Sequence, residues 1–143
     1  MHILFIGLNH TSAPVSLRER LVFDEEQVRA SLSRLACGHS LSSIAEMAIV
    51  STCNRIEIYA ASNTLAFAEL EAFLLEARAV PAYELHPHIY RAGDMEAVSH
   101  LFHVAAGLDS LVIGEPQILG QVDRKSTRLN SSHIQKSRMP SSA

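Results

Sequence analysis

The sequence predicts an α+β domain with a ferredoxin-like β-α-β-β-α-β order of elements, followed by further helices. Apolar stretches that are typical of strands occupy residues 3–8, 43–50 and 55–61. The second and third stretches are joined by a short polar connection, which indicates a hairpin or a tight bend. A weak fourth strand within residues 86–91 follows a helical stretch and completes the split β-α-β unit.

Two helices are expected between the first and second strands. The shorter helix covers residues 15–21. The longer helix starts after Asp24, because Asp24 and Gln27 have the spacing of a capping box. Phe23 and Val28 flank this cap at the positions of a hydrophobic staple.

Two more helices follow the hairpin. The first is predicted over residues 64–79, and Pro81 ends it. Its apolar side is formed by Leu65, Ala68, Ala72 and Leu75. The second helix begins with Asp94 as its cap and ends before Gly107. Its apolar face is formed by Met95, Val98, Leu101 and Ala105.

The segment from Gly107 to Val122 mixes glycines and polar side chains with apolar residues. Buried polar groups need hydrogen-bond partners, so a plain core helix explains this pattern poorly. We expect the segment to form a wall of a polar pocket. Pro116 suits the first turn of a new helix, whose apolar pattern stops abruptly after Val122.

Charge usage changes abruptly after Val122. Residues 1–122 contain no lysine and carry fourteen acidic residues against seven arginines, a net charge of −7, whereas the remainder holds five basic residues. A basic, serine-rich tail can act as a nucleic-acid arm. However, residues 123–143 resemble a translated sequencing adapter. We therefore predict a domain over 1–122 with an incomplete C-terminal edge, and a non-native, disordered tail over 123–143.

Composition excludes several classes of protein. The 143 residues are 48% hydrophobic and 19% charged, which is ordinary for a soluble globular protein. No window approaches the ~18 apolar residues of a membrane span, and no secretory leader is present. Two cysteines without a C-x-x-C spacing predict free thiols and no metal site.

Cys53 is the candidate reactive residue, because it lies in the connection where two strands meet. Arg55, two positions later, adds a fixed positive charge that favours thiolate over thiol and can clamp a carboxylate. The alternative is that Cys53 is a small buried hydrophobe, since unpaired cysteine is among the most buried residue types. Cys37 has no basic neighbour in sequence, and we interpret it as structural.

Three motifs together resemble glutamyl-tRNA reductase. They are Gly7 to Arg20 (GLNHTSAPVSLRER), Ser51 to Arg55 (STCNR), and Gly107 to Val122 (GLDSLVIGEPQILGQV). The resemblance covers residues 1–122 and implies the N-terminal catalytic domain of this enzyme family. The family reduces glutamyl-tRNA to glutamate-1-semialdehyde, the first step of tetrapyrrole (haem, chlorophyll) synthesis by the five-carbon route.

The resemblance also implies roles for individual residues. Cys53 matches the nucleophile, whose thiolate attacks the activated ester and leaves a glutamyl thioester. His100 matches a histidine suited to polarising the carbonyl or transferring a proton. Matches to substrate contacts are Thr52, Cys53, Asn54, Arg55, Ser110, Glu115, Pro116, Gln117 and Gln121. Charge complementarity assigns Arg55 to the glutamate side-chain carboxylate and Glu115 to the substrate ammonium.

The family uses NADPH as its cofactor, forms a homodimer, and has the downstream glutamate-1-semialdehyde aminomutase as a further partner. Its nicotinamide-binding and dimerisation domains follow at this point, but no G-x-G-x-x-G follows a strand in this sequence. The long spine helix expected beyond Val122 is cut at its start. We therefore expect a chain without its own cofactor site, able at best to form the thioester and lose it to water.

Two other functions fit the same residues. A stand-alone thiol acyl hydrolase would use Cys53 and His100. A non-catalytic ferredoxin-like module that binds an acidic ligand would use Arg55 as its anchor and leave Cys53 inert. The reductase and the acyl hydrolase both require the Cys53 sulfur to lie at the end of the sheet, within reach of an imidazole and a guanidinium.

Overall fold

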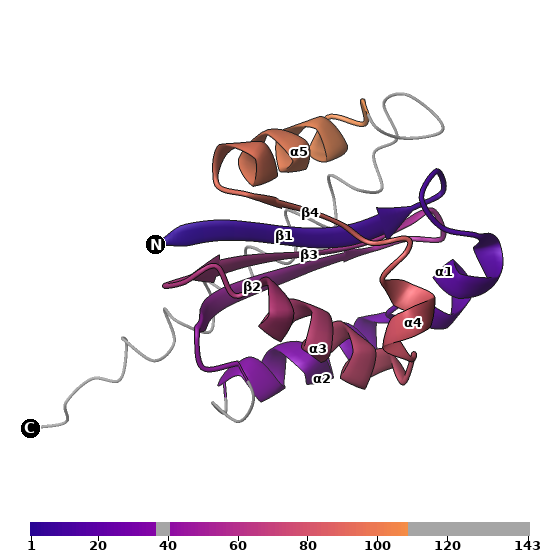
Figure 1. The fold of residues 1–143 in the computed structure, drawn as a ribbon, viewed down its shortest axis with the longest axis horizontal. Coiled ribbons are helices and arrows are strands. Elements are labelled where there is room, and N and C mark those ends of the chain that lie inside the picture. Colours follow the sequence, from indigo (N-terminus) through magenta and orange to yellow (C-terminus); the bar gives the residue numbers. More distant parts are fainter. Residues whose placement is uncertain (37–40, 109–143) are drawn as a thin grey trace, which may run out of the picture.

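The computed structural model describes residues 1–36 and 41–108, and its centre is a four-stranded sheet (Figure 1). The strands are β1 (His2–Asn9), β2 (Ile44–Ser51), β3 (Arg55–Ser62) and β4 (Tyr90–Gly93). Their order is β2-β3-β1-β4, and all neighbours are antiparallel. This order confirms the predicted ferredoxin-like arrangement, in which β3 inserts between the parallel strands β1 and β2.

Helices cover both faces of the sheet. Figure 1 shows α2, α3 and α4 below the sheet and α5 above it. The helices are α1 (Val15–Leu21), α2 (Glu25–Ala36), α3 (Phe67–Arg78), α4 (Ala82–Leu85) and α5 (Met95–Ala105). Two of the residues buried in α1, Leu17 and Leu21, belong to the same core cluster as Leu70 and Leu74 of α3. Among the described helices, α5 therefore forms a third layer of its own on the second face.

The strand alternation separates two hydrophobic cores. Ile56 and Ile58 of β3 belong to the larger core under α1 to α3, whereas Tyr59 packs with Phe5, Ala97 and Val104 under α5. Strand β3 is therefore buried on both faces, although the alternation of Ile56, Ile58 and Ala60 with Glu57 and Tyr59 is the pattern of a half-buried strand. Its second face is covered because α5 returns across the sheet, a tertiary contact that the strand's own alternation does not encode.

Several boundaries and caps agree with the sequence. Helix α1 has the predicted bounds, 15–21. The capping box of α2 forms in both directions, since Asp24 N donates to Gln27 Oε1 at 2.9 Å and Gln27 N donates to Asp24 Oδ1 at 2.8 Å. Phe23 and Val28 are both buried in the larger core, as the staple requires.

The predicted apolar side of α3 is wrong. The helix begins only at Phe67, so Leu65 lies outside it and is 62% exposed. The buried residues are Leu70, Phe73 and Leu74, which share one side at the spacing of a helix. The prediction failed because alanines and leucines occur on both sides, and the larger Phe73 decides which side packs inward. The short helix α4 was also not predicted.

Asp94 precedes α5, but its side chain does not cap the helix, contrary to the prediction. It has a φ of 52°, and its carboxylate accepts instead from the N–H of Ile3 and from His2 Nδ1, both at 3.1 Å. This contact ties the start of α5 to the start of β1. The predicted apolar face of α5 is also wrong at Met95, which is 77% exposed, because Ala97 and Val104 are the residues that face the sheet.

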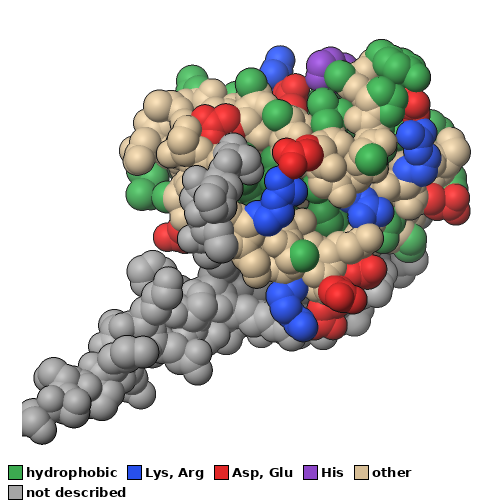
Figure 2. All heavy atoms as spheres, turned by 90° about the horizontal axis from the view of Figure 1, so that it is seen from below, with side chains coloured by type: hydrophobic (Ala, Val, Ile, Leu, Met, Phe, Trp, Pro, Cys, Tyr) green, Lys and Arg blue, Asp and Glu red, His purple; other side chains and the backbone are tan. Residues whose placement is uncertain are grey.

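The face formed by α2, α3 and α4 carries interspersed charges of both signs (Figure 2). Arg34 of α2 pairs with Glu76 of α3, and Arg20 of α1 pairs with Glu84 of α4. The described part of this face therefore offers no patch of one sign to a polyanion. None of the described helices has the length and apolar character needed to cross a membrane.

Candidate active site

Cys53 lies in the tight bend that joins β2 to β3, as the sequence predicted. Thr52 N donates to the carbonyl of Arg55 at 2.9 Å, which closes the bend. The Thr52 hydroxyl accepts from the N–H groups of Asn54 and Arg55, both at 3.2 Å. This local side-chain cap replaces the ladder hydrogen bonds that the bend interrupts.

A buried arginine holds the bend from the side of α1. Arg18 is 7% exposed, and its Nη1 donates to the Cys53 carbonyl at 2.8 Å and to Asn54 Oδ1 at 3.3 Å. Its Nε donates to the Ala13 carbonyl at 3.3 Å. One rigid guanidinium therefore links the turn after β1 to the backbone of the cysteine.

Cys53 is an exposed residue, and its thiol is free of disulfide bonds. The thiol makes no hydrogen bond with the described residues. The interpretation of Cys53 as a small buried hydrophobe is therefore wrong. An exposed sulfur on a fixed backbone has the access that a nucleophile needs.

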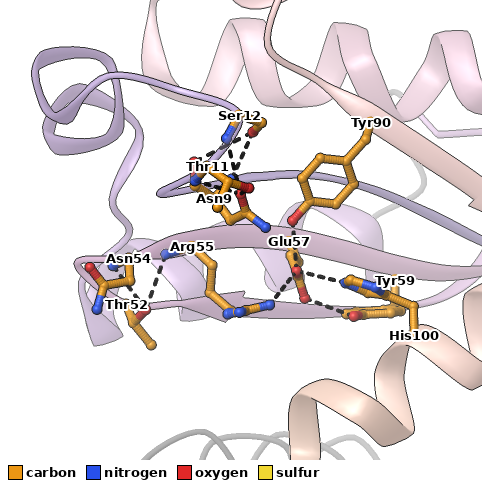
Figure 3. A network of polar contacts seen from close by, with 10 residues as sticks. All are labelled: Asn9, Thr11, Ser12, Thr52, Asn54, Arg55, Glu57, Tyr59, Tyr90 and His100. Atoms are coloured by element: carbon orange, nitrogen blue, oxygen red, sulfur yellow. Dashed lines mark hydrogen bonds and ion pairs between the residues drawn. The ribbon is translucent and has the colours of Figure 1, made fainter. Parts of the chain in front are cut away.

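A buried carboxylate follows four residues beyond the cysteine, on β3. Glu57 is fully buried, and its Oε1 accepts from Arg55 Nη1, Tyr90 OH and His100 Nε2, each at 2.9 Å (Figure 3). Its Oε2 accepts from Tyr59 OH at 2.7 Å. We call Arg55, Glu57, Tyr59, Tyr90 and His100 the Glu57 cluster. Four donors satisfy the hydrogen bonds of an ionised carboxylate that is buried away from solvent.

Gly7 makes room for this cluster. It lies in β1 between Glu57 of β3 and Tyr90 of β4 in the strand register. A Cβ atom at Gly7 would lie 2.7 Å from Glu57 Cγ and 2.9 Å from the Ile56 carbonyl oxygen. Because Gly7 has no side chain, the carboxylate and the Tyr90 phenol can meet across β1.

The cluster fixes the protonation of its members. Burial alone raises the pKa of Glu57, but the His100 hydrogen bond, the Arg55 charge and the Tyr59 hydrogen bond together lower it. Glu57 is therefore ionised at neutral pH. Burial, then the charge of Glu57 and the hydrogen bond to it, raise the pKa of Tyr59, which keeps its proton and donates.

His100 projects from α5 onto the sheet. Its ring stacks on Phe5 with centroids 4.4 Å apart, and its side chain is 24% exposed. The exposed side borders a shallow hollow that is also lined by Met95, Glu96, Ser99 and His103. Because an ionised carboxylate only accepts, His100 Nε2 is the donor to Glu57.

The structure groups the predicted site residues in two places. Thr52, Cys53 and Asn54 share the bend, whereas Arg55 and His100 meet on Glu57. The Cys53 thiol makes no hydrogen bond to the imidazole or the guanidinium among the described residues, and its reach to them stays a prediction. Ser110, Glu115, Pro116, Gln117 and Gln121 lie outside the described residues, as does Cys37.

Sequence reasoning missed Arg18, Glu57 and Tyr90. A signal existed for Glu57, since an acidic residue lies between isoleucines in a strand with a basic residue two positions earlier on the same face. Arg18 belonged to the first motif, but its partner Cys53 is 35 residues away. The described residues contain no cluster of three or more side chains able to hold a metal ion.

Fold and site together define a ferredoxin-like α+β domain with an exposed thiol at the end of its sheet and a buried carboxylate cluster behind it. The family model for the glutamyl-tRNA(Glu) reductase N-terminal domain matches residues 6–139. The chain therefore belongs to the glutamyl-tRNA reductase family. The match runs past Val122, and the domain boundary predicted there lies outside the described residues.

A solved structure supports the same relationship. Glutamyl-tRNA reductase from Methanopyrus kandleri is similar to this chain, with 28% sequence identity and a TM-score of 0.64. The similarity covers 88% of this chain and 27% of that chain. The sequence therefore corresponds to little more than a quarter of the solved relative.

Proposed function

We propose that this chain provides the acyl-transfer part of glutamyl-tRNA reduction. Cys53 attacks the ester carbonyl of glutamyl-tRNA, tRNA leaves, and a glutamyl thioester remains on the sulfur. Hydride from NADPH would then reduce the thioester to glutamate-1-semialdehyde, for tetrapyrrole synthesis. Membership of the reductase family supports this substrate and this product.

The exposed thiol of Cys53 on a fixed bend is the observation that carries the proposal. A large acyl-tRNA ester can reach only a sulfur at the surface. The bend holds the sulfur's backbone through Arg18 and the Thr52 hydroxyl, so little ordering remains to be done when the ester arrives.

Two members of the Glu57 cluster, His100 and Arg55, are proposed to act on the substrate. With Nε2 committed to Glu57, Nδ1 is the atom through which His100 would exchange a proton or polarise a carbonyl. Arg55 is 1% exposed and faces Glu57, so its charge is already partly offset. We retain Arg55 as the contact for the substrate's side-chain carboxylate. An Arg55→Lys variant with unchanged selectivity for glutamyl esters would contradict that role.

We propose that the complete reduction also uses residues outside this sequence. We propose NADPH as the reductant, bound by residues other than those of this chain, because the sequence contains no G-x-G-x-x-G. A homodimer, the downstream aminomutase as a partner and a cytoplasmic location remain proposals drawn from the family. On its own, the chain is expected to form the thioester and hydrolyse it.

Transfer of labelled glutamate tests the proposal. The chain is mixed with glutamyl-tRNA carrying a labelled glutamyl group, quenched in acid, and digested for peptide mapping. We expect label on the Cys53 peptide of the natural sequence and none on a Cys53→Ser variant. Label that persists in the variant, or that never appears in the natural sequence, would contradict the proposal.

Two alternatives predict different results. A general thiol acyl hydrolase would accept other aminoacyl-tRNA esters at similar rates, whereas a reductase domain would discriminate in favour of glutamyl esters. A binding module for acidic ligands would take up no label at all.

A further inference from the structure

Four backbone N–H groups belong to the bend between β2 and β3, and three are used within it. Thr52 N donates to the Arg55 carbonyl, and the N–H groups of Asn54 and Arg55 donate to the Thr52 hydroxyl. The fourth, Cys53 N–H, donates to no atom of the described residues. It belongs to the same exposed residue as the thiol.

Arg18 restrains the Cys53 backbone on its carbonyl side, next to the peptide unit that carries the Cys53 N–H. The peptide unit after Cys53 is held at both ends, because its carbonyl accepts from Arg18 and its N–H donates to Thr52 Oγ1. A planar peptide held at both ends leaves Cys53 little rotational freedom. Arg18 reaches the Ala13 and Cys53 carbonyls and Asn54 Oδ1 at once, which suits a guanidinium and exceeds the reach of an ammonium.

We propose that Arg18 is a positioning residue that aims the Cys53 backbone N–H at the oxyanion formed when Cys53 attacks an ester. The N–H of a nucleophilic residue is a suitable donor for this purpose, because it lies next to the attacked carbonyl. The inference rests on the proposed function, since it assumes that Cys53 accepts the acyl group.

Atoms and electrons balance in this acyl transfer. The thiol loses its proton to solvent, and the thiolate forms a C–S bond to the ester carbon. The carbonyl π pair moves to oxygen, where the Cys53 N–H would stabilise the negative charge. Re-formation of the carbonyl breaks the bond to the terminal ribose oxygen of tRNA, which takes a proton from solvent.

Comparing two reactions of the same thiol tests this proposal in the full chain. Acyl transfer from glutamyl-tRNA passes through an oxyanion, whereas alkylation by iodoacetamide displaces iodide without one. We expect Arg18→Met to slow acyl transfer by about 10²-fold and to change Cys53 alkylation far less. Arg18→Lys should recover part of the acyl transfer, because the ammonium can still donate to the Cys53 carbonyl.

Arg20→Met is the matched control, because Arg20 lies on the same helix with its side chain 48% exposed and pairs with Glu84. It should leave both rates unchanged. An equal loss of alkylation and acyl transfer in Arg18→Met would overturn the inference, since Arg18 would then act on the thiolate. Undiminished acyl transfer would overturn it as well. Absence of acyl transfer in the natural sequence would instead contradict the proposed function.

A measurement on the natural sequence does not depend on how the variants fold. Glutamate-1-semialdehyde is added to the chain labelled with ¹⁵N-cysteine, so that its aldehyde forms a hemithioacetal with Cys53. The Cys53 amide proton is expected to move downfield, because a hydrogen bond to the new hemithioacetal oxygen deshields it. A hemithioacetal that forms without this shift would overturn the inference.

Discussion

The bend around Cys53 and the Glu57 cluster lie only four residues apart in sequence, yet they are built differently. Cys53 in the bend is exposed, and the Arg18 guanidinium and the Thr52 hydroxyl hold the backbone around it. The cluster is buried, and it is held by an ion pair and by donors from three elements. The Cys53 sulfur therefore contributes little to the stability of the core, whereas the Glu57 cluster is part of the core.

The sequence motif at residues 51–55 therefore combines two roles, chemistry at Cys53 and stability at Arg55. Residues 51–55 form one motif, but the structure assigns Cys53 to the surface and Arg55 to the interior. Changes in the bend should alter chemistry and leave stability almost unchanged. Changes in the cluster should alter stability first, and chemistry through the positions of Arg55 and His100.

The largest expected effect is the loss of acyl transfer in Cys53→Ser. Removing the nucleophile should lower the rate by at least ~10³-fold. The free energy of unfolding should change by no more than about 0.5 kcal/mol, because the side chain is exposed and makes no hydrogen bond with the described residues. Urea unfolding and label transfer measure the two effects. A large loss of stability would contradict the claim that Cys53 acts in chemistry and not in stability.

Glu57→Ala should have the largest effect on stability. Removing the carboxylate leaves the buried Arg55 charge uncompensated, which typically costs about 3–5 kcal/mol. The double variant Arg55→Met/Glu57→Leu should be more stable than the sum of the single changes predicts, by about 0.5–3 kcal/mol. Urea unfolding of Arg55→Met, Glu57→Leu and the double variant measures this coupling. Additive losses would contradict a direct interaction between the two charges.

Gly7→Ala should destabilise the domain by about 1–3 kcal/mol. The added Cβ would lie 2.7 Å from Glu57 Cγ, and the Ile56 backbone beside it cannot move freely. Gly93→Ala is the control, because a Cβ there meets its nearest neighbour at an ordinary 3.7 Å. Thermal unfolding compares the two variants. Equal stability would mean that the cluster does not require the space above Gly7.

The smallest expected effect is a pH dependence that Glu57 contributes. Its pKa is lowered in the folded chain, so the unfolded chain takes up a proton first, near the ordinary value of about 4.3. The stability due to Glu57 is present above that pH and is lost as the pH falls through the folded pKa. Urea unfolding at several acidic pH values should show a steeper loss for the natural sequence than for Glu57→Gln. Parallel curves would contradict this contribution.

The sequence predicted what local patterns encode. Helix α1, the Asp24–Gln27 capping box and the Cys53 bend follow from periodicity and turn chemistry within a few residues. The strand order followed from the β-α-β-β-α-β order of elements. The burial of Glu57 did not follow, because it depends on α5 returning across the sheet about forty residues later. The Asp94 cap failed for a similar reason, since the distant Ile3 N–H takes its carboxylate.

The alkylation of Cys53 in the presence and absence of glutamyl-tRNA tests the central claim most directly. The folded chain is treated with iodoacetamide, and peptide mapping follows Cys53 separately from Cys37. We predict that Cys53 is alkylated in the folded chain and that glutamyl-tRNA slows this reaction by occupying or acylating the sulfur. A Cys53 that stays unmodified until the chain unfolds, or that reacts equally fast with bound glutamyl-tRNA, would contradict the claim.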